Sequence, residues 1–347
     1  MKIAQIAPLY ESVPPSHYGG TERVVSYLTE ELMRQKHEVT LFASGDSVTS
    51  ARLVPCCENS LRRDKTCIDP IPHHLLMLER VCRMAPEFDL IHFHVDYLHF
   101  PVSRRHQFMQ LTTLHGRLDI PDLVPLYHEF PEMPVISISD SQRTPLPWLN
   151  WLGTVHHGLP ADLLPFNRQG GDYLAFVGRI SPEKGVETAI AIARKSGIKL
   201  KIAAKVDKAD EEFYQAVIKP LLKNGPLVEY VGEICEEEKK HFLGDALALI
   251  FPINWEEPFG LVQIESMACG TPVIAFARGS VPEVVQDGVS GFLVHDAEGA
   301  VRAANRVGSL SRMRCRSYFE KHFLAARMAG DYVAIYRTLI ANAKCRG

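Results

Sequence analysis

Long apolar runs and an excess of one charge are both missing from this sequence. No stretch approaches the roughly 18 uninterrupted apolar residues that a membrane-spanning helix needs, so we expect no transmembrane segment. The 38 Lys and Arg residues nearly balance the 41 Asp and Glu residues, which leaves a net charge of −3 with His counted as neutral. Such a balance gives no overall affinity for polyanions, and nucleic acid is therefore not an expected partner.

The cysteines show no pairing pattern. The chain has 8 of them, without a Cys-x-x-Cys motif, and they are scattered along its length. This distribution is typical of reduced thiols in a cytoplasmic protein and not of a disulfide framework. The first residues, "MKIAQIAPLY", are too short and too early for a signal peptide and predict a strand. We expect a cytoplasmic location, and peripheral attachment at the inner face of a membrane stays open.

Common catalytic and metal-binding signatures are absent as well. We find no Walker A loop, no Gly-x-Gly-x-x-Gly, no Gly-x-Ser-x-Gly elbow and no Asp-x-Asp. His92, His94 and His99 raise the question of a metal site, but no carboxylate or thiolate clearly completes one. We therefore expect neither a metal ion nor a cofactor.

What is present is the composition of a globular protein of two domains. The chain has 347 residues, of which 46% are hydrophobic and 23% are charged. Nearly continuous apolar runs alternate with helical patterns, as expected for parallel strands that are buried on both faces. The runs cover residues 2–8, 38–44, 89–94, 111–116, 134–139 and 153–158, then 173–179, 198–204, 227–232, 246–253, 272–277 and 291–296.

These two series predict an α/β protein with two doubly wound, Rossmann-like sheets. The polar segment "NRQGGD" (167–172) reads as the linker, which gives domains at 1–168 and 169–322. The last segment, about 323–347, has helical periodicity and predicts a long helix that packs on the first domain. Ligands of such open sheets bind at the carboxyl ends of the strands.

Two glutamates, Glu257 and Glu265, flank "PFGLVQI" near the carboxyl end of one predicted strand. The Pro and Gly between them exclude one regular helix, so we expect Glu257 on a loop and a helix that begins near Leu261 and ends at Gly270. The two carboxylates could accept hydrogen bonds from two sets of vicinal hydroxyls. Alternatively, Glu257 is a solvated loop residue and Glu265 a carboxylate stabilised by the helix dipole.

A second motif, "FVGRISPEKGVETAI" (176–190), places two cations around a tight turn between a strand and a helix. Arg179 offers a planar fork and Lys184 a point charge, a combination suited to a diphosphate. The alternative is a capped helix with surface charges. Paired glutamates alone could also indicate a glycosidase, but that mechanism would not explain the Arg and Lys loop.

The first half contributes two weaker motifs. In "HYGGTERVV" (17–25), Gly19 and Gly20 precede a helix for which Thr21 is the expected N-cap, and they allow a phosphate or sugar to approach the backbone. In "TLHG" (113–116), His115 follows a buried strand at its carboxyl end. Either a structural or a ligand-binding role fits His115.

Together these motifs resemble one family. "GRISPEKG", then "EPFGLVQIESMACGTPVIA" and "GSVPEVVQDGVSGFLV", closely resemble the retaining glycosyltransferases of family 4, which have the GT-B fold. The N-terminal "YGGTERVVSYLTEEL" and "TLHG" fit the same family in the same order. The resemblance spans nearly the whole chain, and its Glu-x7-Glu element runs from Glu257 to Glu265.

The resemblance implies a role for each matched residue. Arg179 and Lys184 would hold the donor diphosphate, Glu257 would accept from hydroxyls of the donor sugar and Glu265 from the ribose. His115 would contact the sugar near the reaction centre. The remaining donor-binding positions are Gly19 and Gly20 in the first domain, and Gly178, Val231, Glu233, Phe259, Gly260 and Leu261 in the second.

The resemblance also implies a reaction: transfer of a hexose from a nucleotide-diphosphate sugar to an acceptor hydroxyl, with retention and without a metal ion. UDP-glucose is the preferred donor and GDP-mannose the nearest rival. The acceptor stays open and could be a small molecule, a saccharide or a lipid-linked glycan. The oligomeric state stays open as well. Alternatives are a nucleotide-sugar epimerase, a phosphorylase-like protein and a nucleotide-sugar binding protein without turnover.

The chain departs from the family at two places. Where many relatives have Asn-Gly, it has His157-Gly158, and "AAKVDK" (203–208) replaces a Gly-rich turn, which makes Lys205 an additional candidate for the donor site. The region 45–88, where acceptor recognition is usually built, carries few motifs.

Overall fold

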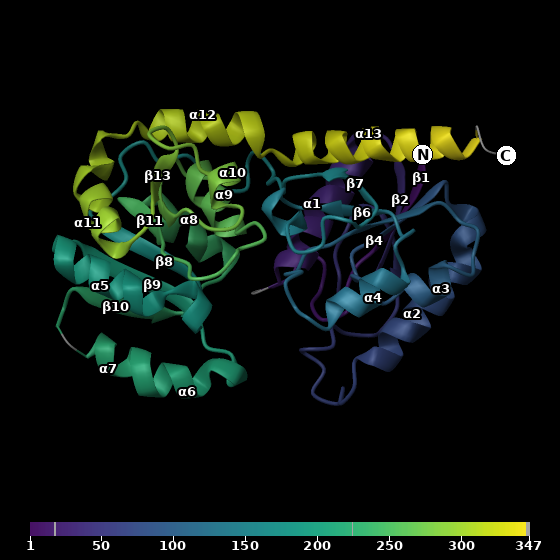
Figure 1. The fold of residues 1–347 in the computed structure, drawn as a ribbon, viewed down its shortest axis with the longest axis horizontal. Coiled ribbons are helices and arrows are strands. Elements are labelled where there is room, and N and C mark those ends of the chain that lie inside the picture. Colours follow the sequence, from purple (N-terminus) through teal and green to yellow (C-terminus); the bar gives the residue numbers. More distant parts are fainter. Residues whose placement is uncertain (17–18, 224, 345–347) are drawn as a thin grey trace. The chain divides into compact units, whose positions relative to one another are not determined.

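The chain folds into two compact units, described here from a computed structural model for residues 1–16, 19–223 and 225–344. Unit 1 comprises Met1–Pro160 and Ala325–Gly347, and unit 2 comprises Ala161–Leu324. The sequence prediction placed the boundaries at 168/169 and 322/323. Each unit contains one parallel sheet with helices packed against it (Figure 1).

The sheet of unit 1 has seven strands in the order β3-β2-β1-β4-β5-β6-β7. Its strands are β1 (Lys2–Ile6), β2 (Glu38–Ala43), β3 (Arg52–Pro55), β4 (Leu90–Phe93), β5 (Gln110–Thr113), β6 (Val135–Ser137) and β7 (Trp151–Thr154). Its helices are α1 (Gly20–Arg34), α2 (Ile71–Met84), α3 (Phe100–Ser103), α4 (Leu123–Glu129) and α13 (Ala325–Lys344), with short 3-10 turns η1 (Ala85–Glu87) and η2 (Ser141–Arg143). The strands' buried apolar side chains, such as Ile6, Phe42 and Phe93, form the core.

The sheet of unit 2 has six strands in the order β10-β9-β8-β11-β12-β13. Its strands are β8 (Tyr173–Arg179), β9 (Lys199–Lys205), β10 (Val228–Gly232), β11 (Ala248–Phe251), β12 (Val273–Phe276) and β13 (Gly291–Val294). Its α-helices are α5 (Val186–Ser196), α6 (Glu211–Phe213), α7 (Lys219–Leu222), α8 (Glu236–Gly244), α9 (Leu261–Ala268), α10 (Val281–Val284), α11 (Ala297–Arg306) and α12 (Arg312–His322). The 3-10 turns are η3 (Pro182–Lys184), η4 (Lys208–Asp210) and η6 (Val307–Ser309), and η5 (Tyr214–Ile218) is a short π-helix.

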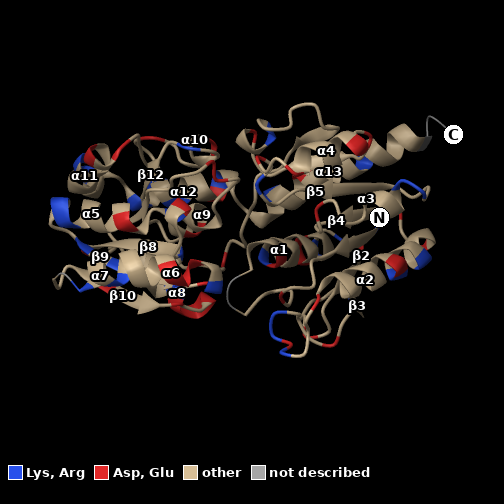
Figure 2. Cartoon of the chain, turned by 60° about the horizontal axis from the view of Figure 1, so that its bottom comes forward, with Lys and Arg blue, Asp and Glu red and all other residues tan. Residues whose placement is uncertain are grey.

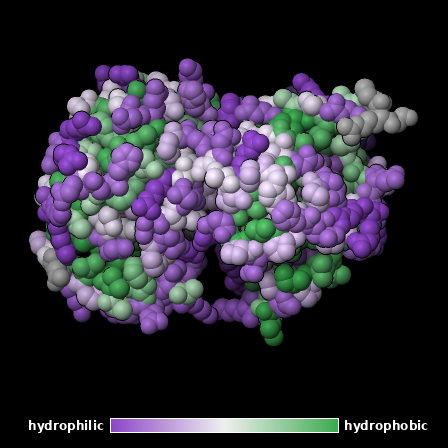
Figure 3. All heavy atoms as spheres, viewed as in Figure 1, coloured by the Kyte–Doolittle hydropathy of each residue, from purple (hydrophilic) through white to green (hydrophobic). Residues whose placement is uncertain are grey.

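The prediction of two parallel α/β sheets is confirmed, since every strand pair within the two sheets is parallel. Helices α5 and α11 pack against each other in unit 2, and α9 contacts α8, α12 and the strands β11 and β12. Polar side chains cover most of the viewed face of each unit, with apolar patches between them (Figure 3). Within the described ranges, no helix combines the length and apolar character that a bilayer crossing requires.

Four details of the sequence prediction are wrong or incomplete. The last strand of unit 1 covers Trp151–Thr154 and not 153–158. Helix α1 begins at Gly20 with Gly19 as its N-cap, and the Arg23 amide bonds the Gly19 carbonyl at 3.1 Å, so Thr21 already lies inside the first turn. Strand β3 and helix α2 were not predicted. Residues 17–18 of the first motif and 345–347 of the predicted terminal helix lie outside the described residues.

Helix α2 escaped prediction because its apolar residues do not follow one stripe. Its buried side chains, among them Met77, Leu78 and Val81, have helical spacing, but Leu75 and Leu76 beside them are exposed. Those outward apolar residues blur the helical period.

Candidate functional site

The carboxyl edge of the unit 2 sheet contains a topological switch point. The chain proceeds from β8 to β9 and β10 on one side, and β11 then pairs with β8 on its other side. The loops that follow β8 and β11 therefore leave the sheet on either side of the position where such sheets bind ligands. These are the loops that carry Lys184 and Glu257.

Glycine is required at the turn after β8. Gly185 adopts φ +69°, and a Cβ atom there would lie 2.1 Å from the Pro252 carbonyl oxygen. The turn can therefore pack directly on the chain that leaves β11 only because residue 185 has no side chain. This close approach brings Lys184 beside the β11 loop.

Lys184 and Glu257 form an ion pair between the two loops. Their side chains are 20% and 10% exposed, and the indole Nε1 of Trp255 donates to Glu257 Oε2 at 3.1 Å. The Lys184 ammonium also lies 4.9 Å from the centre of the Trp255 ring, within the range of a cation–π contact. The alternative of a solvated Glu257 is therefore wrong, and two motifs far apart in sequence meet at one position.

The loop that carries Glu257 is held from two sides. The Ser280 amide donates to the Glu257 carbonyl at 2.9 Å, and the Ser280 hydroxyl donates to the Phe259 carbonyl at 2.9 Å. The Gln263 side chain donates to the same Phe259 carbonyl at 2.8 Å. A Cβ atom at Gly279 would lie 2.4 Å from the Glu257 nitrogen, so the glycine is needed for this packing. The carboxylate is thus presented by a loop of restricted conformation.

Helix α9 begins at Leu261, as predicted, after Gly260 in a left-handed conformation with φ +77°. The first amides of a helix have no carbonyl partner within it and favour anionic or oxygen-rich ligands. Glu265 lies further along α9, is 3% exposed and accepts from Lys239 Nζ of α8 at 2.8 Å. One cation therefore already neutralises this buried carboxylate.

Arg179, the last residue of β8, is surrounded by acidic side chains. It pairs with Glu183, and its guanidinium nitrogens lie 3.7 Å from an Asp207 oxygen and 3.4 Å from an Asp210 oxygen. Lys205, at the end of β9 beside it, lies 2.9 Å from Asp207. The sequence pattern predicted the cations but not these partners.

Acidic and basic side chains therefore lie close together at this edge of the sheet. Acidic and basic residues are interspersed on the elements of unit 2 (Figure 2). Every cation named above has a carboxylate partner in the ligand-free protein. A bound diphosphate would have to take the place of some of these carboxylates.

The other predicted positions of unit 2 lie at the same sheet edge. Gly178 precedes Arg179 in β8, and a Cβ atom there would meet only the Phe176 ring, at 3.8 Å. Val231 lies in the edge strand β10 and is 39% exposed, and Glu233 follows that strand and is exposed.

The predicted positions of unit 1 occupy two places. Gly19 is buried and Gly20 exposed at the start of α1. His115 follows β5, is half-buried and lies against two buried histidines: His94 Nδ1 is 2.9 Å from His115 Nε2, and the His157 ring stacks on His115 with centres 5.4 Å apart. The departure at residue 157 thus lies directly against the predicted sugar-binding histidine.

Burial keeps these histidines neutral. It lowers the pKa of His115 to about 3 and the pKa values of His92, His94 and His157 well below the usual range. His99, with its pKa lowered by burial to about 3, bonds Ser103 and Thr112 at 2.7 Å each. Across residues 1–16, 19–223 and 225–344, no three His, Cys, Asp or Glu side chains are grouped as metal ligands.

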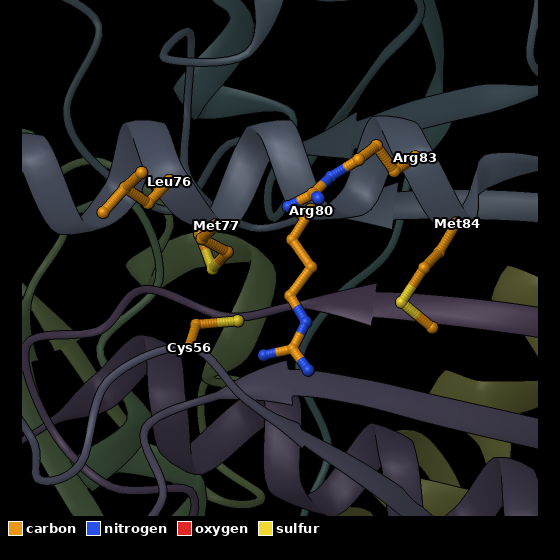
Figure 4. A pocket seen from close by; sticks show the side chains of 6 residues that line it. All are labelled: Cys56, Leu76, Met77, Arg80, Arg83 and Met84. Atoms are coloured by element: carbon orange, nitrogen blue, oxygen red, sulfur yellow. The ribbon is translucent and has the colours of Figure 1, made fainter.

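A separate cavity of about 520 Å³ opens in unit 1 beside the edge strand β3. Five of its lining side chains come from α2 and one from the segment after β3 (Figure 4). They are Cys56, Leu76, Met77, Arg80, Arg83 and Met84. Arg80 donates to the Pro55 carbonyl at 2.7 Å, and burial raises the pKa of the Cys56 thiol to about 12, so the thiol stays neutral.

Sequence reasoning missed Lys239, Trp255 and the acidic partners of Arg179. Lys239 lies in "EEEKKHF", where nothing in the pattern separates an inward lysine from its solvated neighbours. Trp255 stands two residues before Glu257, and an indole beside a candidate site was a signal that could have been used.

Two family models match the chain. "Glycosyltransferase Family 4" matches residues 18–157, and "Glycosyl transferases group 1" matches residues 166–320. Alpha-maltose-1-phosphate synthase of Mycobacterium tuberculosis is 32% identical over 182 residues, 45% of this chain and 46% of that protein. D-inositol 3-phosphate glycosyltransferase of Frankia alni is 34% identical over 153 residues, 41% of this chain and 37% of that protein. The chain thus spans about half the length of the curated relatives it matches, or less.

Solved structures match over nearly the whole chain. Sucrose-phosphate synthase of Thermosynechococcus elongatus has a TM-score of 0.79 at 20% identity and covers 99% of this chain and 100% of its own. Anabaena Alr3699/HepE in complex with UDP and glucose has a TM-score of 0.73 at 18% identity and covers 97% of this chain and 100% of its own. At these identities the likeness shows the fold alone.

Proposed function

The chain belongs to the GT-B glycosyltransferases of group 1 and family 4, and we propose that it transfers a hexose from a nucleotide-diphosphate sugar to an acceptor hydroxyl, with retention and without a metal ion. One observation carries the proposal furthest. The Lys184–Glu257 pair joins the two loops at the switch point of unit 2, and Arg179 ends the strand beside it. A cation for the diphosphate and a carboxylate for the sugar are thus adjacent.

In this proposal donor binding exchanges ion-pair partners. The diphosphate takes Lys184 from Glu257 and Arg179 from its acidic neighbours, so the cations meet the charge that grows on the leaving group. Glu257, released from Lys184, accepts hydrogen bonds from sugar hydroxyls. Glu265 has two carboxylate oxygens, of which Oε1 accepts from Lys239, and it can still accept from the ribose hydroxyls.

No metal ion is needed in this scheme, because the diphosphate charge is met by Arg179, Lys184 and the first amides of α9. The amides of Phe259, Gly260 and Leu261 line the start of that helix, and Val231 and Glu233 lie at the β10 end, where the nucleobase would be contacted. On unit 1, the proposed sugar- and phosphate-binding positions are His115, Gly19 and Gly20. UDP-glucose is the proposed donor and GDP-mannose the rival.

The acceptor is a hydroxyl-bearing small molecule, saccharide or lipid-linked glycan. The cavity beside α2 lies in the region 45–88, where the family resemblance places acceptor recognition. Its lining combines thioether and aliphatic side chains with two arginines, which suits an acceptor with an apolar part and an anionic part.

The reaction is tested by following UDP-glucose, GDP-mannose and ADP-glucose by proton NMR, with EDTA present and with sugar phosphates, oligosaccharides and lipid-linked glycans as acceptors. In transfer, the bond between the anomeric carbon and the diphosphate oxygen breaks, the acceptor oxygen bonds to that carbon, and its proton leaves with the nucleoside diphosphate. We expect turnover of UDP-glucose with an α-linked product. A β-linked product would reject retention, and binding without turnover of any donor would identify a nucleotide-sugar binding protein.

A further inference from the structure

A line of hydrogen bonds connects His115 to the interior of unit 1. Gln5 lies in β1 and is fully buried, and its Oε1 is 2.7 Å from His94 Nε2. His94 directly follows β4, is 2% exposed, and its Nδ1 is 2.9 Å from His115 Nε2. The line thus runs across three neighbouring strands, since Gln5 lies in β1 and the two histidines follow β4 and β5.

The direction of these hydrogen bonds follows from Gln5. Its Oε1 can only accept, so His94 Nε2 carries the proton between them. A neutral imidazole has one ring proton, and burial holds the pKa of His94 far below the usual range, so His94 Nδ1 accepts. His115 Nε2 must then donate, and the neutral His115 ring has a bare Nδ1.

The opposite direction would require Gln5 to be turned by half a rotation about its amide. His115 would then carry its proton on Nδ1, and that atom is buried without a hydrogen-bond partner in the described structure. A buried N–H without a partner is less common in native proteins than an under-used acceptor. The lengths agree, since the amide nitrogen of Gln5 faces Tyr336 at 3.4 Å and its oxygen makes the shorter bond.

A second branch of the network contacts Gln5 through Tyr336. Tyr336 of α13 bonds His92 Nδ1 at 2.7 Å, and His92 Nε2 bonds Thr113 at 2.7 Å. Thr113 in turn bonds Tyr332 of α13 at 3.0 Å. If the Gln5 amide donates to Tyr336, each of these groups can donate to the next, so this branch is compatible with the orientation of Gln5 that the unpartnered Nδ1 of His115 favours.

We propose that Gln5 and His94 are positioning residues that hold the proton of His115 on Nε2, so that Nδ1 is kept as a bare acceptor for a hydroxyl hydrogen of the sugar substrate. The role of Nδ1 as an acceptor for the sugar rests on the proposed function, whereas the position of the proton on His115 does not. The buried, unpartnered Nδ1 is the observation that indicates a ligand, because a hydroxyl would supply the hydrogen bond that the protein leaves unmade.

The proton position is measured on the ligand-free full chain by nitrogen-15 NMR of the histidine rings, with His115 assigned through His115→Gln. A protonated and a bare ring nitrogen differ widely in chemical shift. We expect a protonated Nε2 and a bare Nδ1. A proton on Nδ1, or a charged ring at neutral pH, would overturn the proposal.

Two substitutions at Gln5 test the cause. Gln5→Met removes the acceptor and should leave His115 as a mixture of the two neutral forms, whereas Gln5→Glu keeps an acceptor for His94 and should retain the proton on Nε2. His99→Gln serves as the matched control, because it alters another buried histidine, whose ring nitrogens bond Ser103 and Thr112. If Gln5→Met folds and leaves the His115 shifts unchanged, Gln5 does not position the ring.

The link to catalysis is tested by kinetics on the same variants. In Gln5→Met we expect kcat/KM to fall roughly 10–100-fold, by analogy with the loss of an outer contact of a metal-binding histidine, and UDP affinity to stay unchanged. A kcat/KM in Gln5→Glu close to that of the wild type would support a positioning role for Gln5. An equal fall of kcat/KM in Gln5→Met and His99→Gln would reject that role. An inactive wild type with the expected ring shifts would instead reject the proposed function and leave the proton assignment intact.

Discussion

Lys184→Met should reduce the rate of hexose transfer roughly 10²–10³-fold, the usual cost of removing one group that stabilises charge growing in the transition state. Methionine keeps the length and apolar contacts of the side chain but loses its charge. Because Lys184 meets the leaving diphosphate in our proposal, the loss should appear mainly in kcat. The measurement is steady-state release of nucleoside diphosphate with the donor identified by NMR.

Folding must be separated from chemistry in this variant. Glu257 keeps its hydrogen bond from Trp255 but loses its cation while only 10% exposed, so the unfolding temperature should fall, and activity is compared at a temperature where the variant is folded. Lys195→Met is the matched control, since Lys195 pairs with Glu298 in the same unit and both side chains are more than half exposed. Such exposed pairs contribute about 0–1 kcal/mol, so this variant should be stable and active. Full activity in Lys184→Met would contradict the assigned role.

Unit 1 should lose stability steeply when the pH falls from about 7.5 to about 5.5. Within the described part of unit 1, burial lowers the pKa of His37 and His74, and it lowers most strongly the pKa values of five further histidines: His92, His94, His99, His115 and His157. In the unfolded chain these histidines become protonated near the ordinary histidine pKa of about 6.5, whereas in the folded unit they stay neutral at that pH. Stability is therefore present above that pKa and decreases as the pH falls towards the folded values, which are about 3 for His99 and His115.

The size of this effect is considerable. Each such histidine contributes about 1.4 kcal/mol over that interval, so five contribute on the order of 5–7 kcal/mol, comparable to the stability of a whole domain. Asp96 acts in the opposite direction, because burial raises its pKa to about 6 and its protonation stabilises the folded state. The net loss is therefore smaller than the histidine sum.

Urea unfolding followed by tryptophan fluorescence measures this loss. In Trp255→Phe the remaining tryptophans, Trp148 and Trp151, lie in unit 1 and report its unfolding alone. In His99→Gln the free energy of unfolding should depend less steeply on pH, by the contribution of one titrating histidine. A free energy of unfolding that is flat between these pH values, or a slope that His99→Gln does not alter, would show that the histidines are not held neutral.

Much of the fold could be predicted from the sequence because parallel strands buried on both faces have a strong signature. The strand over Tyr173–Arg179 matched its apolar run completely. Strand β3, with sequence RLVP, did not stand out, because it is a short edge strand with Arg and Pro at its ends. Helix α1 was placed two residues late, because a Thr before an apolar stripe is a common N-cap, whereas here Gly19 is the N-cap.

The candidate site was predictable residue by residue but not as pairs. Arg179, Lys184, Glu257 and Glu265 were each singled out, yet the Lys184–Glu257 contact depends on Gly185 packing against Pro252, which no local pattern reveals. His92 and His94 were weighed as metal ligands. Their actual partners, Gln5, Thr113 and Tyr336, come from distant strands and the last helix, so only the folded unit shows a hydrogen-bond network there.

Calorimetric titration of UDP, GDP and ADP into the wild type and Arg179→Ala, with and without EDTA, tests the nucleotide-sugar site most directly. Our account predicts that UDP binds, that EDTA has no effect, and that binding collapses in Arg179→Ala because the diphosphate loses its bidentate partner. Absence of binding by all three nucleotides, or UDP binding that survives in Arg179→Ala, would contradict the assignment of the donor site to the carboxyl edge of unit 2.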